Sequence, residues 1–312
     1  MDDVPYFLGI DGGATKTDAV LVDRVGRVCG QGRSGPSNYH HIGVDATVTN
    51  VVRAARQALR TARVHSPIDG VVAALSGMNT AHDHRILSRA LTPRLRSIVG
   101  RRLAIVNDVF AAYASGVTRP YGAAIIAGTG SNAIAHGRTG AIAQAGGYGS
   151  LLSDEGSAYA IARAALRAVV RSVDGRGPAT LLTRRLFRAT GSTTIAELAA
   201  YLNHPSTRKD DIAALAPIVE TAAQSGDRVA RRILEKTACD LALMATTVLH
   251  KTALLRTSCE LVLVGGVFRN RAILRRFEQL VRQRALHIVF VHPRTSIAVG
   301  AARLAHGQWG ND

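Results

Sequence analysis

The sequence has 312 residues, of which 47% are hydrophobic and 20% are charged, so it can bury a large core and is not a disordered chain. Three scattered cysteines, Cys29, Cys239 and Cys259, exclude a disulfide scaffold, and since no apolar run reaches about 18 residues, we expect no membrane span. The net charge of +17 would suit nucleic acid, but the arginines are dispersed and aromatic residues make up only 4% of the chain, so base-stacking platforms are not indicated.

The first part of the chain alternates strands with helices. A short apolar run over residues 6–10 stops at Asp11-Gly12-Gly13, and a second strand follows after a turn that is too long for a two-residue hairpin. Apolar residues at helical spacing, with arginines opposite, predict a helix over 46–64. The predicted strands are 6–10, 18–23, 27–33, 70–75 and 103–106, and the predicted helices are 46–64, 84–96 and 109–116.

The same order of strand, small-residue turn and strand recurs around residues 128–131, which indicates an internal duplication of architecture. Strands that alternate with helices predict an α/β fold with largely parallel sheets. A Gly and a Pro within residues 115–121 predict a domain boundary there. The predicted strands of this part are 122–127, 132–136, 261–264 and 287–291, and the predicted helices are 155–171, 179–189, 194–202, 209–224, 227–254, 270–283 and 296–306.

Two glycine-rich turns favour phosphate binding. In residues 11–17, DGGATKT, the glycines allow several backbone N–H groups to approach one anion, and Asp11 at the strand end could hold Mg²⁺ through water. An ordinary Gly-rich hairpin is the alternative, and the Walker A pattern is absent. Residues 128–131, GTGS, form a second glycine-rich turn of this kind. Two such turns at equivalent points of duplicated halves would face each other across a cleft, which favours the phosphate interpretation.

Asp108 follows the predicted strand 103–106, and the carboxyl ends of strands line the ligand crevice of open α/β sheets. A carboxylate at this place can accept the proton of a bound hydroxyl during phosphoryl transfer. Alternatively, Asp108 is the N-cap of the helix that follows, a role that aspartate fills well. The residues alone leave both interpretations open.

Two further glycine-rich segments have the same ambiguity. In residues 146–158, Asp154 or Glu155 could merely complement the N-terminus of the next helix, but the three glycines within 146–149 and the two acids that follow also suggest polar ligand contacts. Gly265 and Gly266, between a strand and a helix, would let a nucleotide approach the backbone or would simply form a tight turn.

Together, DGGATKT, the strand-end ND, GTGSN, GGYG with SDEGSAY, and VLVGGV resemble the sugar kinase/Hsp70/actin superfamily, and within it the N-acetylglucosamine kinase branch of the BadF/BadG/BcrA/BcrD ATPase-like family. The resemblance covers about residues 6–304. It implies two ribonuclease H-like domains of the actin-like ATPase fold with a cleft between them. The N-terminal domain would span 1–118, with the C-terminal helix 296–308 packing back on it, and the C-terminal domain would span 119–295.

The resemblance also implies a role for individual residues, with Asp108 as the catalytic base and Asp11 holding Mg²⁺ through water. ATP would be bound by Gly12, Gly13, Ala14, Thr15, Lys16, Thr129, Gly130, Gly265, Gly266 and Arg269. The sugar would be bound by Asn38, Ser76, Gly77, Asp108, Ser131, Asn132, Gly147, Tyr148, Gly149, Asp154 and Ala158. The family often has Trp at the place of Tyr148, and Gly or Asp at the place of Met78-Asn79, which bears on the sugar that fits.

The function implied by the resemblance is the ATP- and Mg²⁺-dependent phosphorylation of an amino sugar at its 6-hydroxyl, with N-acetylglucosamine giving N-acetylglucosamine 6-phosphate. Glucosamine and N-acetylmuramic acid stay open as alternative substrates. We expect a cytoplasmic homodimer whose partners are the amino sugar and ATP, with no nucleic acid and no membrane partner. The acidic first residues do not resemble a signal peptide.

Three functions of other classes are less consistent with these residues than the kinase. The ATPase activator of a radical dehydratase shares an iron–sulfur cluster between subunits through cysteines near Gly-rich loops, whereas Cys29, Cys239 and Cys259 lie elsewhere. A sugar-responsive repressor of the ROK type would need a helix-turn-helix where a strand is predicted at Tyr6. Salt-sensitive DNA binding without ATP turnover would favour a nucleic-acid-binding module.

Overall fold

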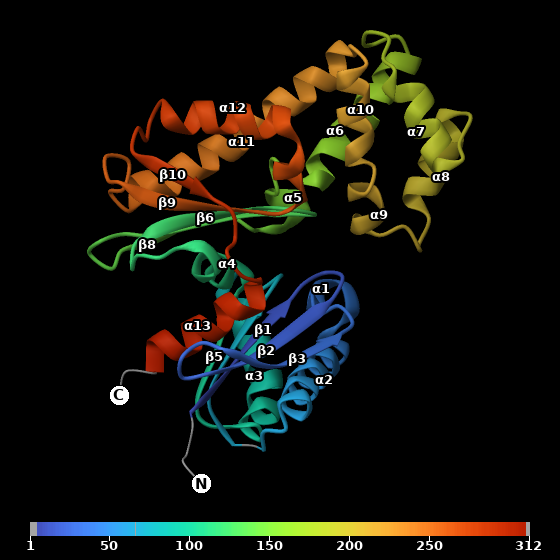
Figure 1. The fold of residues 1–312 in the computed structure, drawn as a ribbon. Helices are drawn as coiled ribbons and strands as arrows, with labels where there is room; N and C mark the ends of the chain where they lie inside the picture. Colours follow the sequence, from blue (N-terminus) through green and yellow to red (C-terminus); the bar gives the residue numbers. More distant parts are fainter. Residues whose placement is uncertain (1–4, 66, 310–312) are drawn as a thin grey trace. The chain divides into compact units, whose positions relative to one another are not determined.

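The computed structural model describes residues 5–65 and 67–309 (Figure 1). The chain divides into two compact units, and each contains a five-stranded sheet covered by helices, so the predicted α/β class is confirmed. The first unit comprises Met1–Ala124, Glu260–Val262 and Val291–Asp312, and the second comprises Ile125–Cys259 and Leu263–Phe290. The domain limits inferred from the resemblance stay a prediction.

The sheet of the first unit is mixed. Its strand order is β3-β2-β1-β4-β5, with β1, β2 and β3 antiparallel and with β1, β4 and β5 parallel. The register pairs Gly12 with Leu75 and Leu75 with Asn107, so the three parallel strands end side by side at one edge. The strands are β1 (Tyr6–Gly12), β2 (Thr17–Asp23), β3 (Val28–Ser34), β4 (Ile68–Leu75) and β5 (Val99–Asn107).

Helices cover both faces of this sheet (Figure 1). Successive residues of β1 point to opposite faces, so that Leu8 packs in the core with α2 and α3, and Phe7 packs in the core with α13. Helix α13 follows far along the chain but lies against β1, where a Cβ on Gly9 would come 2.0 Å from the carbonyl oxygen of Ala298. The helices are α1 (Tyr39–Ile42), α2 (Val44–Ala62), α3 (Ala81–Arg96), α4 (Asp108–Gly116) and α13 (Ile297–Trp309).

The second sheet has the order β10-β9-β6-β7-β8, in which β7 and β8 are antiparallel. Helices α11 and α12 lie along this sheet, and α6 to α10 gather beside it (Figure 1). The strands are β6 (Gly122–Ala127), β7 (Ser131–His136), β8 (Ile142–Gly146), β9 (Cys259–Val264) and β10 (Ile288–Val291). The helices are α5 (Gly149–Leu152), α6 (Ala158–Val173), α7 (Leu182–Thr190), α8 (Ile195–Asn203), α9 (Lys209–Ala213), α10 (Ala216–Gln224), α11 (Arg228–Lys251), the 3-10 helix η1 (Gly266–Arg269) and α12 (Arg271–Arg282).

The structure corrects several predicted elements. Helix α1, strand β8 and helix α5 were not predicted, since each has only four or five residues. The helix predicted from residue 155 begins at Ala158 because Ser157 is its N-cap and accepts a hydrogen bond from the N–H of Ala160. The helix predicted over 209–224 is two helices, α9 and α10. Pro217 in the first turn of α10 has no N–H to continue the earlier helix, which favours a new start there.

Candidate functional site

The three parallel strand ends of the first unit bring distant segments together. Because Gly12, Leu75 and Asn107 are in register, the residues that follow each strand meet at the same edge of the sheet. The backbone N–H of Ser76 donates to the carbonyl oxygen of Gly12 at 2.8 Å, which joins the first turn to the segment after β4. The predicted site residues at this edge are Asp11, Gly12, Gly13, Ala14, Thr15, Lys16, Asn38, Ser76, Gly77 and Asp108.

The first glycine-rich turn is held from two sides. Within it, the N–H of Gly13 donates to the carbonyl of Lys16 at 2.9 Å. From outside, the N–H of Ser37 donates to the carbonyl of Gly13 at 2.9 Å. The side chain of Lys16 donates to Asp18 at 2.6 Å on the exposed side of β2, whereas Thr15 stays exposed at the tip of the turn. The turn is therefore fixed at its base, with its tip open to a ligand.

Two carboxyl groups lie at this edge. Burial, followed by the negative charges of Asp108 and Asp18, raises the pKa of Asp11 to about 7. Burial also raises the pKa of Asp108 to about 6. The charge of Asp108 acts on Asp11, so the two groups are close enough to repel each other when both are ionised. An edge of this kind favours a bound cation, and Asp108 can accept a proton near neutral pH.

Asp108 is not the N-cap of the helix that follows. The cap is Asn107, whose side-chain oxygen accepts a hydrogen bond from the N–H of Val109 at 3.0 Å, and Asp108 is the first residue of α4. The N-cap interpretation of Asp108 is therefore wrong. Its carboxylate accepts hydrogen bonds from the backbone N–H groups of Val109 and of Asp108 itself, which lower its pKa, but burial outweighs them.

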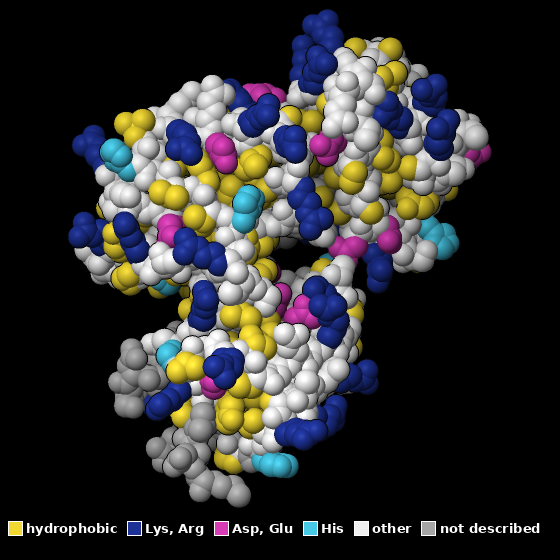
Figure 2. All heavy atoms as spheres, in the orientation of Figure 1, with side chains coloured by type: hydrophobic (Ala, Val, Ile, Leu, Met, Phe, Trp, Pro, Cys, Tyr) yellow, Lys and Arg dark blue, Asp and Glu magenta, His cyan; other side chains and the backbone are white. Residues whose placement is uncertain are grey.

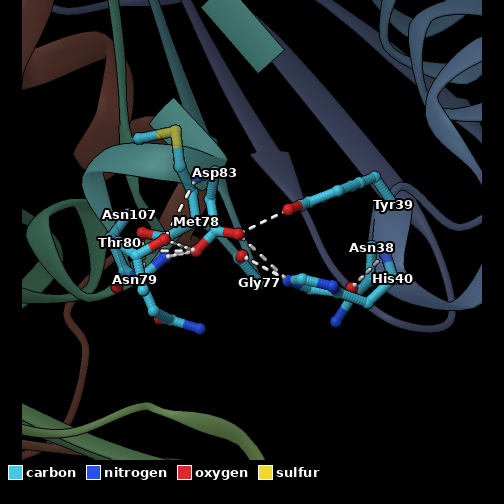
Figure 3. A network of polar contacts seen from close by, with 9 residues as sticks. All are labelled: Asn38, Tyr39, His40, Gly77, Met78, Asn79, Thr80, Asp83 and Asn107. Carbon is cyan, nitrogen blue, oxygen red and sulfur yellow. Dashed lines mark hydrogen bonds and ion pairs between the residues drawn. The ribbon is translucent and has the colours of Figure 1, made fainter. Parts of the chain in front are cut away.

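Asn38 and Gly77 are neighbours in the first unit (Figure 3). Gly77 has a φ of +83°, and a Cβ at this position would lie 2.7 Å from the side-chain oxygen of Asn38. Both the backbone conformation and the space therefore require glycine. The hydroxyl of Ser76, next to Gly77, is buried and forms no hydrogen bond within the described residues. A polar ligand would satisfy it.

Asp83 is a site neighbour that the sequence did not reveal. Its carboxylate is only 5% exposed and contacts Tyr39, His40 and the segment 79–80, so it lies between the loop of Asn38 and the loop of Gly77 (Figure 3). Thr80 and Asp83 form a capping box, which the spacing T-x-x-D could have indicated. That spacing contains no signal for the contact with Tyr39, which is 44 residues away.

The second unit contains the other glycine-rich turn. The N–H of Gly128 donates to the carbonyl of Gly130 at 2.9 Å, and the N–H of Ala158 donates to the carbonyl of Gly128 at 2.8 Å. A Cβ on Gly265, whose φ is +107°, would lie 2.2 Å from the carbonyl oxygen of Ala127. Three segments therefore lie close together: the turn at Thr129, the start of α6 and the segment after β9. Each of them contains predicted site residues.

Asp154 supports this turn and does not complement the helix that follows it. It is 4% exposed, it has a φ of +70°, and its Oδ1 accepts a hydrogen bond from the N–H of Ser131 at 3.1 Å. Its Oδ2 accepts from the Nζ of Lys209 at 2.6 Å. No acidic residue lies in the first turn of α6, so the helix-complement interpretation is wrong. Lys209 was not predicted, and its distance of 55 residues from Asp154 gave no local signal.

Some of the remaining predicted residues of the second unit lie at the turn of Ser131, and others lie at the start of α5. The N–H of Gly147 donates to the carbonyl of Ser131 at 3.0 Å, and a Cβ on Gly147 would lie 2.8 Å from the side chain of Asn132. These residues therefore join the turn. Tyr148 is exposed, and Gly149 begins α5 beside it.

Arg269 lies at a cavity of about 770 Å³ in the second unit. Helices α10, α11 and α12 supply its walls, and four arginines line it: Arg231, Arg269, Arg271 and Arg275. Gly265 and Gly266 are not among its lining residues. Glu220 and Glu235 also line it, and its volume suits a nucleotide-sized ligand.

The described residues give less support to a nucleic-acid surface, a metal cluster or a membrane span. Lys and Arg side chains are spread over the visible face of each unit and do not gather in one patch (Figure 2). Over residues 5–65 and 67–309, no group of three or more His, Cys, Asp or Glu side chains could hold a metal ion. Cys29 is half-buried, Cys239 exposed and Cys259 buried, and none of the three forms a disulfide. Within the same residues, no helix is long and apolar enough to cross a membrane.

The chain is similar to known proteins over most of its length. The model of the BadF/BadG/BcrA/BcrD ATPase family matches residues 8–305. An N-acetyl-D-glucosamine kinase of Dictyostelium discoideum is 30% identical over 279 residues, 86% of this chain and 87% of that protein. An N-acetylmuramic acid/N-acetylglucosamine kinase of Clostridium acetobutylicum is 28% identical over 270 residues, 85% of this chain and 86% of that protein.

Solved structures share the fold. A protein of Chromobacterium violaceum, described provisionally as an N-acetylglucosamine kinase, has a TM-score of 0.77 at 23% identity, covering 97% of this chain and 99% of its own. A ROK family glucokinase of Streptomyces griseus, in complex with glucose and AMPPNP, has a TM-score of 0.58 at 18% identity, covering 97% and 99%. Both likenesses show that the chain shares the fold of these proteins.

Proposed function

Because the chain belongs to the BadF/BadG/BcrA/BcrD ATPase family, we propose that it is an ATP-dependent kinase that phosphorylates the 6-hydroxyl of an amino sugar. The relatives named above act on N-acetylglucosamine or N-acetylmuramic acid, and a 27% identical relative of Vibrio cholerae is a glucosamine kinase. N-acetylglucosamine is the leading substrate and N-acetylglucosamine 6-phosphate the product. Glucosamine and N-acetylmuramic acid are the alternatives.

The observation that carries this proposal is the position of Asp108. Its carboxylate follows β5 at the edge where the first glycine-rich turn also ends, and Asn107, not Asp108, is the N-cap of α4. In the proposed reaction, Asp108 accepts the proton of the sugar hydroxyl while that oxygen bonds to the γ-phosphorus of ATP and the bond from this phosphorus to the β–γ bridging oxygen breaks. The products are the sugar phosphate and ADP, and the proton passes from the enzyme to solvent.

We assign the nucleotide to both glycine-rich turns. The backbone N–H groups and the hydroxyls of Thr15 and Thr129 are suited to phosphate oxygens. In the second unit, the arginine-lined cavity at Arg269 is large enough for the adenosine. The other proposed nucleotide contacts are Gly12, Gly13, Ala14, Lys16, Gly130, Gly265 and Gly266.

The residues present also fit Mg²⁺. Asp11 and Asp108 repel each other at one edge of the sheet, and Mg²⁺ is usually bound by one or two carboxylates together with waters and phosphates. We propose that Asp11 holds the ion through water. When bound, the ion would neutralise charge on the phosphates of ATP.

The sugar is assigned to residues of each unit that lie next to these turns. In the first unit, the unsatisfied hydroxyl of Ser76 and the pair Asn38 and Gly77 supply polar groups beside Asp108. In the second unit, the buried carboxylate of Asp154 and the neighbouring loop supply the rest. The proposed contacts of the second unit are Ser131, Asn132, Gly147, Tyr148, Gly149, Asp154 and Ala158.

We further propose a homodimer in the cytoplasm. An odd number of scattered cysteines without a disulfide suits a reducing compartment. Light scattering on the purified protein measures the oligomeric state, and fractionation of the producing cell measures the location.

A coupled assay of ADP formation tests the proposed function. The protein is incubated with ATP and Mg²⁺ and with a panel of N-acetylglucosamine, glucosamine, N-acetylmuramic acid and glucose. We expect sugar-dependent turnover with one of the amino sugars and a 6-phosphate identified by NMR. Hydrolysis of ATP that does not depend on sugar, with no sugar phosphate formed from any member of the panel, would overturn the proposal.

A further inference from the structure

We propose that Asp83 is a positioning residue for the sugar: one oxygen of its carboxylate holds Tyr39 and His40, and thereby keeps Asn38 in place against Gly77 (Figure 3). Asp83 itself need not touch the sugar. The inference rests on the proposed function, in which Asn38 and Gly77 contact the sugar.

The two oxygens of Asp83 have different tasks. Oδ2 accepts hydrogen bonds from the N–H of Asn79 at 3.0 Å and from the N–H and hydroxyl of Thr80, each at 2.8 Å. These contacts cap α3, the helix to which Asp83 belongs. Oδ1 accepts a hydrogen bond from the hydroxyl of Tyr39 and lies 3.4 Å from the Nε2 of His40. Capping thus uses one oxygen, and the other reaches a different segment of the chain.

The charge of Asp83 is retained in this buried place. Burial raises its pKa, but hydrogen bonds from Tyr39, Thr80 and the backbone outweigh the burial and hold the pKa below its ordinary value. The pKa of Tyr39 is raised to about 12, by burial and by its hydrogen bond to Asp83. Tyr39 therefore stays protonated as a donor to a carboxylate, and such a bond is stronger than a bond between neutral groups.

Contacts lead from Asp83 to the proposed sugar residues. The ring centroids of His40 and Tyr39 are 4.1 Å apart, with the two rings tilted by 34°. The Nε2 of His40 lies 3.1 Å from the carbonyl oxygen of Gly77. The backbone N–H of His40 donates to the side-chain oxygen of Asn38 at 3.2 Å, which fixes the direction of the Asn38 amide. Displacement of Tyr39 and His40 would therefore free both Asn38 and the loop at Gly77.

The same loop is attached to the strand that precedes Asp108. The side-chain amide of Asn107 donates to the carbonyl of Met78 at 3.0 Å and to the side chain of Asn79 at 2.7 Å. Segment 77–80 is therefore held by Asn107 on one side and by Asp83 on the other. In this arrangement Asp83 sets the distance from Asn38 and Gly77 to the proposed base.

The variant Tyr39→Phe tests the inference because it removes only the hydroxyl that contacts Oδ1. We expect KM for the amino sugar to rise about tenfold, the size of one hydrogen bond to a charged group. We expect kcat and KM for ATP to change less than about twofold. Replacement of Asp83 itself is less informative, because loss of the helix cap could prevent folding.

Thr80→Val is the matched control. It removes the hydroxyl that contacts Oδ2 of the same aspartate, but the backbone N–H groups of Asn79 and Thr80 still hold Oδ2 and the Tyr39 contact is intact. We expect its melting temperature to fall by about 2–4 °C through loss of the cap, with KM for the sugar within about twofold of the original. A merely structural role of Asp83 predicts the same change of KM in both variants.

A double-mutant cycle adds a second readout. If Tyr39 acts through Asn38, Tyr39→Phe should lower kcat/KM for the sugar about tenfold in the original protein and less than about twofold in an Asn38→Ala background. Full additivity, or an unchanged KM in Tyr39→Phe, overturns the inference while sugar kinase activity persists. Absence of amino-sugar phosphorylation in the unmodified protein overturns the proposed function, and this inference with it.

Discussion

The ammonium group of Lys209 lies 2.6 Å from Oδ2 of Asp154, which joins helix α9 to the glycine-rich segment before α6. Asp154 is almost fully buried, and the side chain of Lys209 is 21% exposed. A carboxylate in this position needs a cation or several donors, because loss of solvent destabilises its charged form. The pair therefore connects α9 with the predicted ligand turn.

Lys209→Met should destabilise the protein by about 1–3 kcal/mol, since it leaves a buried carboxylate without its cation while the partial exposure of Lys209 limits the loss. Urea denaturation measures the change. Lys236→Met is the control, because the ion pair of Lys236 with Asp240 is exposed and should contribute at most about 0.5 kcal/mol. Equal, small losses in both variants would show that the pair with Asp154 contributes little.

Asp108→Asn should lower kcat at least about 100-fold, because an amide cannot accept the proton of the sugar hydroxyl. The side chain keeps its size, so folding and much of the sugar binding should be retained. Steady-state kinetics give the rate, and calorimetric titration with the amino sugar gives the affinity. A variant with near-normal turnover would remove Asp108 from the chemistry.

Gly77→Ala should lower kcat/KM for the sugar by about tenfold or more, since its Cβ would collide with the side-chain oxygen of Asn38. The positive φ adds backbone strain of about 1–2 kcal/mol. Gly26→Ala separates the two effects, because Gly26 has a φ of +78° and its Cβ would meet nothing within 4 Å. It should lower the unfolding free energy by a similar amount without changing the kinetics. If both variants have the same kinetics, the contact between Gly77 and Asn38 is irrelevant to the sugar.

The stabilising effect of Asp227 should depend on pH. Burial raises the pKa of this carboxyl, but hydrogen bonds from the N–H groups of Ala230 and Leu181 and from the hydroxyl of Thr180 outweigh it and lower the pKa. A group whose pKa is lower in the folded state stabilises the fold above its unfolded value of 3.8 and loses this effect as pH falls through the folded value.

Asp227→Asn should therefore reduce the unfolding free energy by about 1–2 kcal/mol at pH 7 and by much less at pH 3. Urea denaturation at both pH values measures the difference. An equal loss at the two values would mean that the charge of Asp227 does not matter. Thr194→Ala, at the N-cap of α8, offers a control in which the capping group does not titrate.

Local sequence patterns were sufficient for the α/β class, for most helices and strands and for the positions of the two glycine-rich turns. Period-two and helical spacings are properties of neighbouring residues, and glycine marks turns wherever it stands. The short elements α1 and β8 were missed because their sequences, YHHI and IAQAG, are neither continuous apolar runs nor long enough to define a periodicity. The break between α9 and α10 was missed although Pro217 marks it.

Only the tertiary structure decided how these elements meet. The register of Gly12, Leu75 and Asn107 depends on parallel pairing between segments far apart in the chain, which no local pattern specifies. The same holds for the choice of Asn107 over Asp108 as helix cap, since the cap depends on the backbone angles at the end of β5. Asp154 is paired with Lys209, and Asp83 with Tyr39, although both partners come from distant segments. A buried carboxylate needs donors, and the packing of the chain decides which donors reach it.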